Sequence, residues 1–177
     1  MTARGREILP HTADTGLRAW APDLPGLFEE AAAAVAEIAA EVPAEVRAVV
    51  ASGVPGGGIA AGVPGDGIAS GVPGGGTVVG ADEDRLLLEA PDLVGLAFAW
   101  LNELVGLADV RHAALAGTSV RRVGVAAGGC QIEARAWFVD RAAPGVRLRH
   151  DVKSATYHGL VVEREGETWS LTAYLDI

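Results

Sequence analysis

Trp169-Ser-Leu-Thr-Ala-Tyr-Leu-Asp-Ile177 is the stretch that decides the fold of this chain. Its apolar residues alternate with polar ones, in the period of two that is typical of a strand with one buried face. Asp176 falls on the polar face of the predicted strand. We expect its carboxylate to lie beside the α-carboxylate of the last residue, and two oxyanions at one strand end require a nearby cation.

Length and composition narrow the possible classes of protein. A chain of 177 residues is long enough for one domain with a real core and short for two. The net charge of −9 and the pI near 4.8 disfavour direct, tight binding to nucleic acid. The single cysteine, Cys130, can form neither an intramolecular disulfide nor a thiolate zinc cage. No signal peptide or membrane span is apparent, which predicts a cytoplasmic protein with no membrane partner.

Two stretches have the spacing of helices. Asp23 is placed to cap a helix that ends near Glu41, before Pro43, and its apolar residues recur along one face. Those residues are Leu27, Phe28, Ala31, Val35 and Ile38. A second helix, residues 93–104, follows Pro91-Asp92 and is apolar almost all round. We therefore expect this second helix to be the central one and to be buried on most of its surface.

The remaining regular segments have the composition and alternation of strands, and glycines mark the hairpin turns between the later ones. Residues 109–117 fit either a connection or a short extra strand. The predicted strands are 7–9, 17–20, 45–50, 84–90, 120–125, 131–139, 152–163 and 167–175. Their order predicts an α+β fold, with antiparallel or mixed sheets packed on two main helices.

A repeat separates the first third of the chain from the rest. Three near-copies of nine residues, each built on Gly-Val-Pro-Gly, occupy residues 52–78. Glycine and proline at this density bury little apolar surface, so we predict a low-complexity insertion at about residues 52–80 of a single domain, 1–177. A phosphate-binding glycine loop is rejected, because it needs a strand before it and a helix after it.

Residues 141–153 form the one basic stretch in an acidic chain. The first interpretation is a solvated polar surface, because exposed ion pairs contribute little. The second is a docking surface for an acidic or phosphate-bearing partner. Its basic residues are Arg141, Arg147, Arg149, His150 and Lys153.

Few residues remain that could carry chemistry, since the chain lacks a Gly-x-Ser-x-Gly elbow and a His-Glu-x-x-His motif. They lie in two short stretches at opposite ends of the sequence, and taken singly each residue type is more often structural than functional. Two carboxylates with a main-chain or terminal oxygen suit Ca²⁺ or Mg²⁺, with waters completing the shell. The candidates are His11, Asp14, Lys153, Tyr157, His158, Asp176 and Ile177.

Taken together, these stretches resemble the archease family. The N-terminal signature of the family is similar to His11-Thr-Ala-Asp14 followed by Gly16. Its second helix is similar to Asp92-Leu93 with Trp100-Leu-Asn-Glu-Leu104. Lys153-Ser-Ala-Thr-Tyr-His158 is similar to its Lys-x-x-Thr-Tyr-His motif, and the sequence stops at Asp-Ile as archeases do. The resemblance spans nearly everything outside the repeat.

The resemblance implies a non-catalytic activator of the RtcB-type RNA ligase of tRNA splicing and RNA repair. Such a protein promotes guanylylation of the ligase by GTP and multiple turnover. The implied metal ligands are Asp14, Asp176 and an oxygen of Ile177, with Ca²⁺ expected at the protein's own site and Mg²⁺ or Mn²⁺ as alternatives. Lys153 and Tyr157 would serve the partner surface, and His11 and His158 would support the carboxylates.

Two other functions stay open. A chaperone-like interaction protein would suppress aggregation of unrelated clients, independently of Asp14, Asp176 and divalent metal. A metal-dependent hydrolase would turn over substrate as the isolated protein. This hypothesis has weak support, because the chain lacks hydrolase motifs.

Excision of residues 52–78 should leave both thermal stability and ligase stimulation nearly unchanged, because a passive insertion contributes little to the core. Thermal denaturation and a guanylylation assay of the excised protein against the full chain test this. A large loss of either property would refute the passive insertion.

Overall fold

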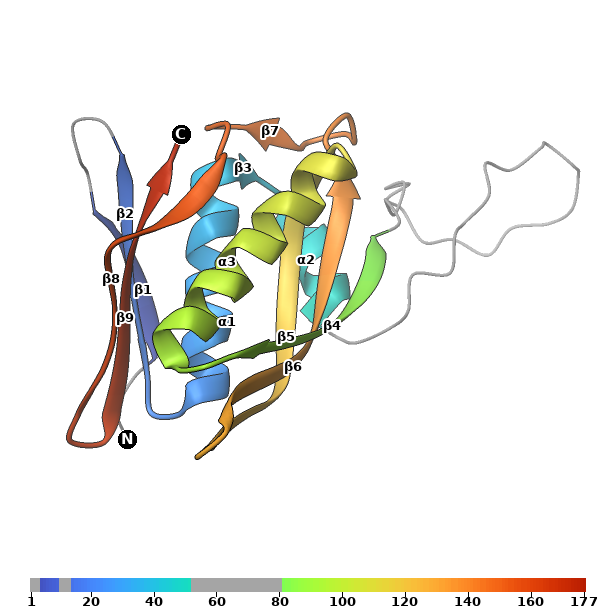
Figure 1. Cartoon of the computed structure of the whole chain (residues 1–177). Helices are drawn as coiled ribbons and strands as arrows, with labels where there is room; N and C mark the ends of the chain where they lie inside the picture. Colours follow the sequence, from blue (N-terminus) through green and yellow to red (C-terminus); the bar gives the residue numbers. More distant parts are fainter. Residues whose placement is uncertain (1–3, 10–13, 52–80) are drawn as a thin grey trace, which may run out of the picture.

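Two antiparallel sheets enclose the two long helices of this protein (Figure 1). The structure is a computed structural model that describes residues 4–9, 14–51 and 81–177. Within these residues the strands are β1 (Gly5–Leu9), β2 (Thr15–Ala21), β3 (Ala40–Glu41), β4 (Asp82–Ala90), β5 (Ala113–Ala126), β6 (Gly129–Asp140), β7 (Arg147–Leu148), β8 (Ser154–Glu165) and β9 (Thr168–Asp176). The helices are α1 (Leu24–Ala39), α2 (Ala44–Ala51) and α3 (Leu93–Val110). The predicted α+β class is confirmed.

The strands form a four-stranded sheet in the order β1-β2-β9-β8, a three-stranded sheet in the order β4-β6-β5, and a small β3-β7 pair. Helix α1 packs against β2 of the first sheet and β5 of the second, and α3 packs against β8 and β4 (Figure 1). The main core therefore lies in the helical layer and on the inner faces of both larger sheets.

Both long helices begin at the predicted aspartate caps. Asp23 accepts a hydrogen bond from the Gly26 amide at 2.7 Å, and Asp92 accepts one from the Gly95 amide at 2.7 Å. Each carboxylate satisfies a backbone donor that has no partner inside its helix, and its negative charge suits the helix N-terminus.

Helix α1, rather than α3, is the central helix, so the prediction for α3 is wrong. The predicted apolar face of α1 is buried, and Ala32 and Ala34 on either side of it are fully buried too. In α3 the buried residues lie on one face, and the other residues of the predicted range 93–104 are only partly buried. The alanines of α1 let both sheets approach closely, whereas the larger outer residues of α3 are only partly covered.

Among the described residues, α3 is the one helix that is long and apolar enough to cross a membrane. Its Trp100 is nevertheless fully buried, and the indole Nε1 donates a hydrogen bond to the Phe28 carbonyl at 3.0 Å. This bond ties α3 to α1 inside the folded domain, as expected of a core helix.

The strand predicted at residues 45–50 is wrong, because this segment belongs to α2. The Arg47 amide donates to the Pro43 carbonyl at 3.2 Å, which closes the first helical turn. Val46 packs on a second apolar cluster that contains Val42 and Trp137. Val46, Val49 and Val50 recur at i, i+3 and i+4, which is the spacing of a helix and not the alternation of a strand.

Strand β5 of the three-stranded sheet is longer than predicted. The unassigned residues 109–117 divide between the end of α3 and the start of β5. Two register shifts, between Leu115 and Gly117 and between Val120 and Arg122, interrupt the alternation in β5. In β6 the predicted inward residues are buried, and so is Cys130, whose pKa is raised by burial. The inward set is Ile132, Ala134, Ala136 and Phe138.

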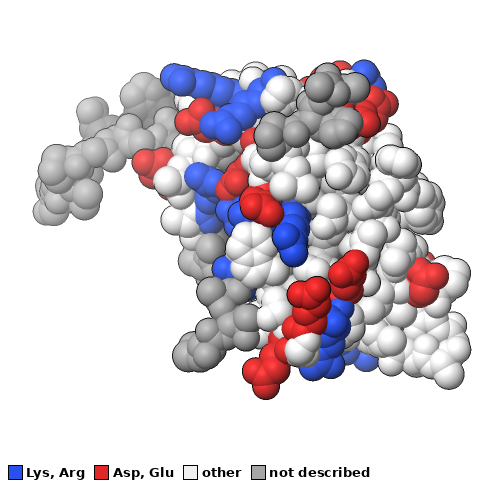
Figure 2. Space-filling view, turned by 90° about the vertical axis from the view of Figure 1, so that its left-hand side faces the viewer, with Lys and Arg blue, Asp and Glu red and all other residues white. Residues whose placement is uncertain are grey.

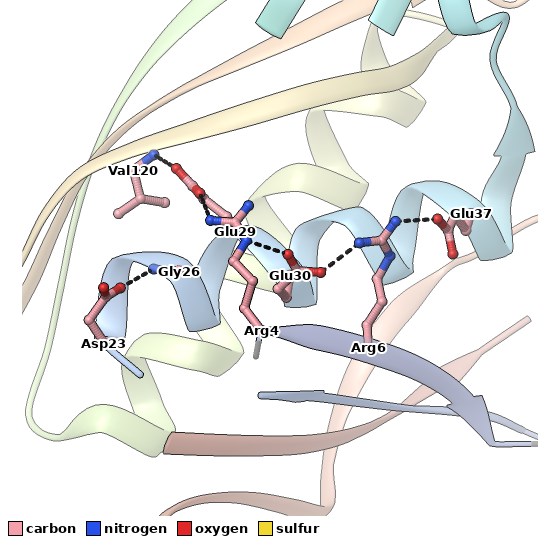
Figure 3. Close-up of polar contacts among 8 residues, drawn as sticks. All are labelled: Arg4, Arg6, Asp23, Gly26, Glu29, Glu30, Glu37 and Val120. Atoms are coloured by element: carbon pink, nitrogen blue, oxygen red, sulfur yellow. Dashed lines mark hydrogen bonds and ion pairs between the residues drawn. The ribbon is translucent and has the colours of Figure 1, made fainter. Parts of the chain in front are cut away.

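An ion-pair network ties β1 to α1 (Figure 3). Arg4 contacts Glu29 at 3.0 Å and Glu30 at 2.7 Å, and Arg6 contacts Glu30 at 2.6 Å and also Glu37. Hydrogen bonding to Glu37 raises the pKa of Arg6, although its partial burial acts against this. Glu30 is only 6% exposed, and each of its oxygens faces one guanidinium, so its charge is fully compensated.

Replacing Glu30 with Gln should lower the free energy of unfolding by about 1–3 kcal/mol, because two guanidinium groups lose a buried carboxylate. Glu7→Gln is the matched control, since its pair with Arg18 spans 3.9 Å and both side chains are about half exposed. Urea denaturation should show that Glu7→Gln lowers the free energy of unfolding by less than about 1 kcal/mol. Equal losses in the two variants would contradict a structural role for the network.

Candidate functional site

The register between β2 and β9 brings two predicted ligands to one end of the four-stranded sheet. Thr15, the first residue of β2, pairs with Leu175, so Asp14 directly precedes the paired segment and Asp176 directly follows it; extending the antiparallel register by one position would set the two opposite each other. Asp14 is half-buried and Asp176 is exposed. The start of β2 and the end of β9 therefore lie at the same end of the four-stranded sheet (Figure 1), although they are remote in sequence.

Lys153 lies at the same sheet end. Its amide donates to the Asp176 carbonyl at 2.8 Å, and its ammonium Nζ donates to the Ile177 main-chain oxygen at 3.3 Å. Ser154, the first residue of β8, pairs with Asp176. The one lysine of the chain is thus held beside the carboxylates by backbone pairing, and its charge offsets part of theirs.

Asn102 on α3 fixes the start of β8. Its amide nitrogen donates to the Ala155 carbonyl at 3.2 Å, and its amide oxygen accepts from the Ala155 N–H at 3.0 Å. Because β8 is an edge strand, these backbone groups have no neighbouring strand to pair with. The Asn102 side chain takes the place of that strand and positions the segment that begins at Lys153.

Tyr157 and His158 lie in an irregular part of β8, where the register shifts between Thr156 and Val161. The Tyr157 ring is 60% exposed and stacks on Phe98 of α3, with ring centroids 3.8 Å apart. Gly159 has a φ of 66° and packs so close to Tyr174 that a Cβ would lie 2.7 Å from its ring. The irregularity therefore turns Tyr157 outward onto the helix.

The two predicted supporting histidines do not add to this geometry. His158 is exposed, and the structure gives it no hydrogen bond among the residues it describes. His11 lies outside the described residues. Their supporting role stays a prediction.

The donors at this sheet end are all oxygens. Asp14 and Asp176 supply carboxylates and Ile177 a main-chain oxygen, which is a set that suits a hard divalent cation. In the described part of the chain, no three His, Cys, Asp or Glu side chains cluster in a way that could hold a metal. The residues therefore fit an open, partial cation site, whose remaining ligands would come from water or another molecule, rather than a closed cage.

Comparison with known proteins agrees with this arrangement of motifs. The model of the archease protein family matches residues 7–53 and 73–177, which leaves out the middle of the repeat. The chain belongs to the archease family. Residues 54–72 lie outside the match. No curated protein matches the chain significantly.

A solved archease-like structure has the same fold. The solution structure of protein 1598 from Methanobacterium thermoautotrophicum matches with a TM-score of 0.64 and 22% sequence identity. The match covers 98% of this chain and 99% of that one. At this identity the likeness establishes the archease fold alone.

Sequence reasoning assigned no role to Asn102 or Phe98. One signal was available for Asn102, because it is the only asparagine of the chain and stands in an apolar helix. Buried polar groups are almost always hydrogen-bonded, so an amide at that position predicts a specific partner. Phe98 offered no such signal, since one more apolar residue in an apolar helix predicts only packing.

Replacing Asn102 with Leu should lower the free energy of unfolding by about 1–3 kcal/mol, because both Ala155 backbone groups lose their partner. Hydrogen exchange at the Ala155 amide should become faster than in Glu103→Gln, a change at the next position of the same helix. Unchanged protection of that amide in Asn102→Leu would show that Asn102 does not hold β8.

Proposed function

We propose that this archease is a non-catalytic protein cofactor of an RtcB-type RNA ligase in the cytoplasm. It promotes the GTP-dependent guanylylation of the ligase and its multiple turnover in tRNA splicing and RNA repair. The family membership supports this proposal. The observation that carries it is the pairing of Thr15 with Leu175, which brings the flanking Asp14 and Asp176 to the same sheet end as Lys153 and the Ile177 oxygen.

The position of these groups favours presentation to another protein. Asp176 and Lys153 are both exposed, and they stand at the end of strands rather than in an enclosed cleft. A catalytic site of the protein's own would need groups that surround a substrate and exclude water. An exposed strand end with two carboxylates can instead enter the active site of a partner enzyme.

Each residue has a separate task in this proposal. Asp14 and Asp176, with the Ile177 main-chain oxygen, would hold a divalent cation, with Ca²⁺ expected in the free protein and Mg²⁺ or Mn²⁺ as alternatives. A bound cation supplies positive charge that neutralises phosphate oxygens and orders ligands. Lys153 orients the Ile177 oxygen through its ammonium group and carries a charge to the partner or its nucleotide.

The acidic character of the chain is compatible with binding through the ligase rather than through RNA. On the outer face of the four-stranded sheet, basic and acidic side chains lie next to each other, and a broad area carries no charged residue (Figure 2). The described residues of this face form no extended basic surface of the kind that binds a phosphate backbone.

The uncharged area also favours a second candidate function, the chaperone-like interaction protein. Exposed apolar side chains occur on β8, where Tyr157 is 60% and Val161 39% exposed. Exposed apolar surface commonly binds other proteins. Such binding would suppress aggregation of unrelated clients without need of Asp14, Asp176 or a divalent cation.

Replacing Asp176 with Asn should lower the stimulated rate of ligase guanylylation by at least about tenfold, because one of two carboxylates loses its charge without losing its shape. The assay mixes the archease with a cognate ligase, GTP and Mn²⁺ or Mg²⁺, and counts guanylylated ligase. Asp82→Asn, at an exposed position of β4, is the control and should stimulate normally.

Full stimulation by the Asp176→Asn protein would refute the proposed role of the carboxylate pair. Aggregation of an unrelated client is measured in parallel, with and without EDTA. Suppression that survives both Asp176→Asn and EDTA, in the absence of ligase stimulation, would establish the chaperone-like function instead.

A further inference from the structure

Residues 147–153, here called the basic strip, cross the end of α1 next to the carboxylate pair. The strip begins with β7, which pairs with β3 directly after α1. The amides of Arg149 and His150 both donate to the Ala39 carbonyl, at 2.8 and 3.3 Å. The backbone of the strip is therefore fixed to the last turn of a buried helix, while its side chains from Arg147 to Asp151 are exposed.

The basic groups of the strip are poorly neutralised compared with other arginines of the chain. Arg111 and Arg121 contact carboxylates at 2.5 and 2.6 Å. Arg149 contacts Glu41 at 3.4 Å, with both side chains about half exposed. Among the described residues, Arg147 and His150 have no ion-pair or hydrogen-bond partner for their side chains. An exposed pair of this length contributes little, so these groups are available to a ligand.

The strip leads directly into the carboxylate pair. Lys153 is its last residue, and the Lys153 amide is bonded to the Asp176 carbonyl. Figure 1 shows β7 and the C-terminus at the same end of the molecule, and both signs of charge occur along that end in Figure 2. Lys153 follows Arg149 by four positions, which limits their Cα atoms to about 14 Å apart. One small ligand can therefore contact both regions.

We propose that the basic strip binds the phosphate groups of a nucleoside triphosphate whose divalent cation is held by Asp14 and Asp176. Mg²⁺ in proteins is usually bound by one or two carboxylates together with substrate phosphates, and the site here offers two carboxylates. Arginine forks match phosphate oxygens in geometry and charge. The inference rests on the proposed function for the source of the nucleotide, which is the GTP consumed by the ligase.

A short triphosphate fits these observations better than an RNA chain does. The basic strip is only seven residues long, whereas the whole chain carries a net charge of −9. A long polyanion would extend beyond the strip into this repulsive field, while a triphosphate would remain within it. The strip also carries no Phe, Tyr or Trp on which a base could stack.

The local charges make binding depend on a cation. Arg147, Arg149 and Lys153 are outnumbered by acidic groups, which are Asp14, Glu41, Asp151, Asp176 and the α-carboxylate of Ile177. Without a divalent cation the region is net negative and repels phosphate. A cation at the carboxylate pair removes this excess of negative charge, so binding of a triphosphate strengthens.

The test is calorimetric titration of the isolated full-length protein with Mg²⁺·GTP and with Mg²⁺·tripolyphosphate. Both should bind with similar affinity, since the phosphates are recognised, and the double variant R147Q/R149Q should bind each at least about tenfold more weakly. The control R85Q/R121Q removes two exposed arginines from the three-stranded sheet and should change affinity less than twofold. Thermal denaturation verifies that both variants are folded.

Absence of binding, or equal binding by R147Q/R149Q and the unchanged protein, would overturn the inference. Tighter binding of a single-stranded RNA than of tripolyphosphate, lost in R147Q/R149Q, would overturn it in favour of an RNA site. Ligase guanylylation is measured with the same proteins. If stimulation of the ligase still requires Asp176 although the archease binds no triphosphate, the inference fails and the proposed function stands. If stimulation of the ligase does not require Asp176, the proposed function fails independently.

Discussion

The pairing of β2 with β9 is the constraint on which the rest of the structure depends. Seven consecutive residue pairs join these strands, from Thr15–Leu175 to Ala21–Trp169. The inward residues of both strands are fully buried, so a slip by one position would bring serine and threonine into the core. Burial therefore fixes the register, and the register brings the flanking Asp14 and Asp176 to one sheet end. The inward residues are Leu17, Ala19, Ala21, Leu171, Ala173 and Leu175.

The two long helices pack on the inner side of this sheet, and α3 also positions the segment that contains Lys153. The buried Glu30 on α1 anchors β1 through Arg4 and Arg6, so the edge next to β2 is tied to the core. At the other edge, Asn102 on α3 holds the start of β8, and with it Lys153. Two polar contacts from the helical layer thus fix both edges of a sheet whose centre is fixed by apolar burial.

Much of this fold follows from the sequence, because its signals are local. The alternation in residues 169–175 and the caps at Asp23 and Asp92 each depend on a few neighbouring residues, and all are confirmed. The strand predicted at 45–50 is wrong because the helical spacing of its valines was overlooked. The central place given to α3 is wrong because an apolar pattern alone does not show what will cover a segment. The bulges in β5 break its alternation and so conceal its length.

For the site, the family resemblance implies Asp14, Asp176, Ile177 and Lys153, and the strand register brings these residues, distant in sequence, to one sheet end. Residue type could not identify them, since an aspartate in a loop is more often a turn or cap residue. Asn102 was missed because its partner is a backbone group 53 positions away. The most direct test is an anomalous difference map from crystals soaked in Mn²⁺. A peak between the carboxylates of Asp14 and Asp176 is expected; no peak there, with both side chains ordered, would contradict the assignment of this strand end as a cation site.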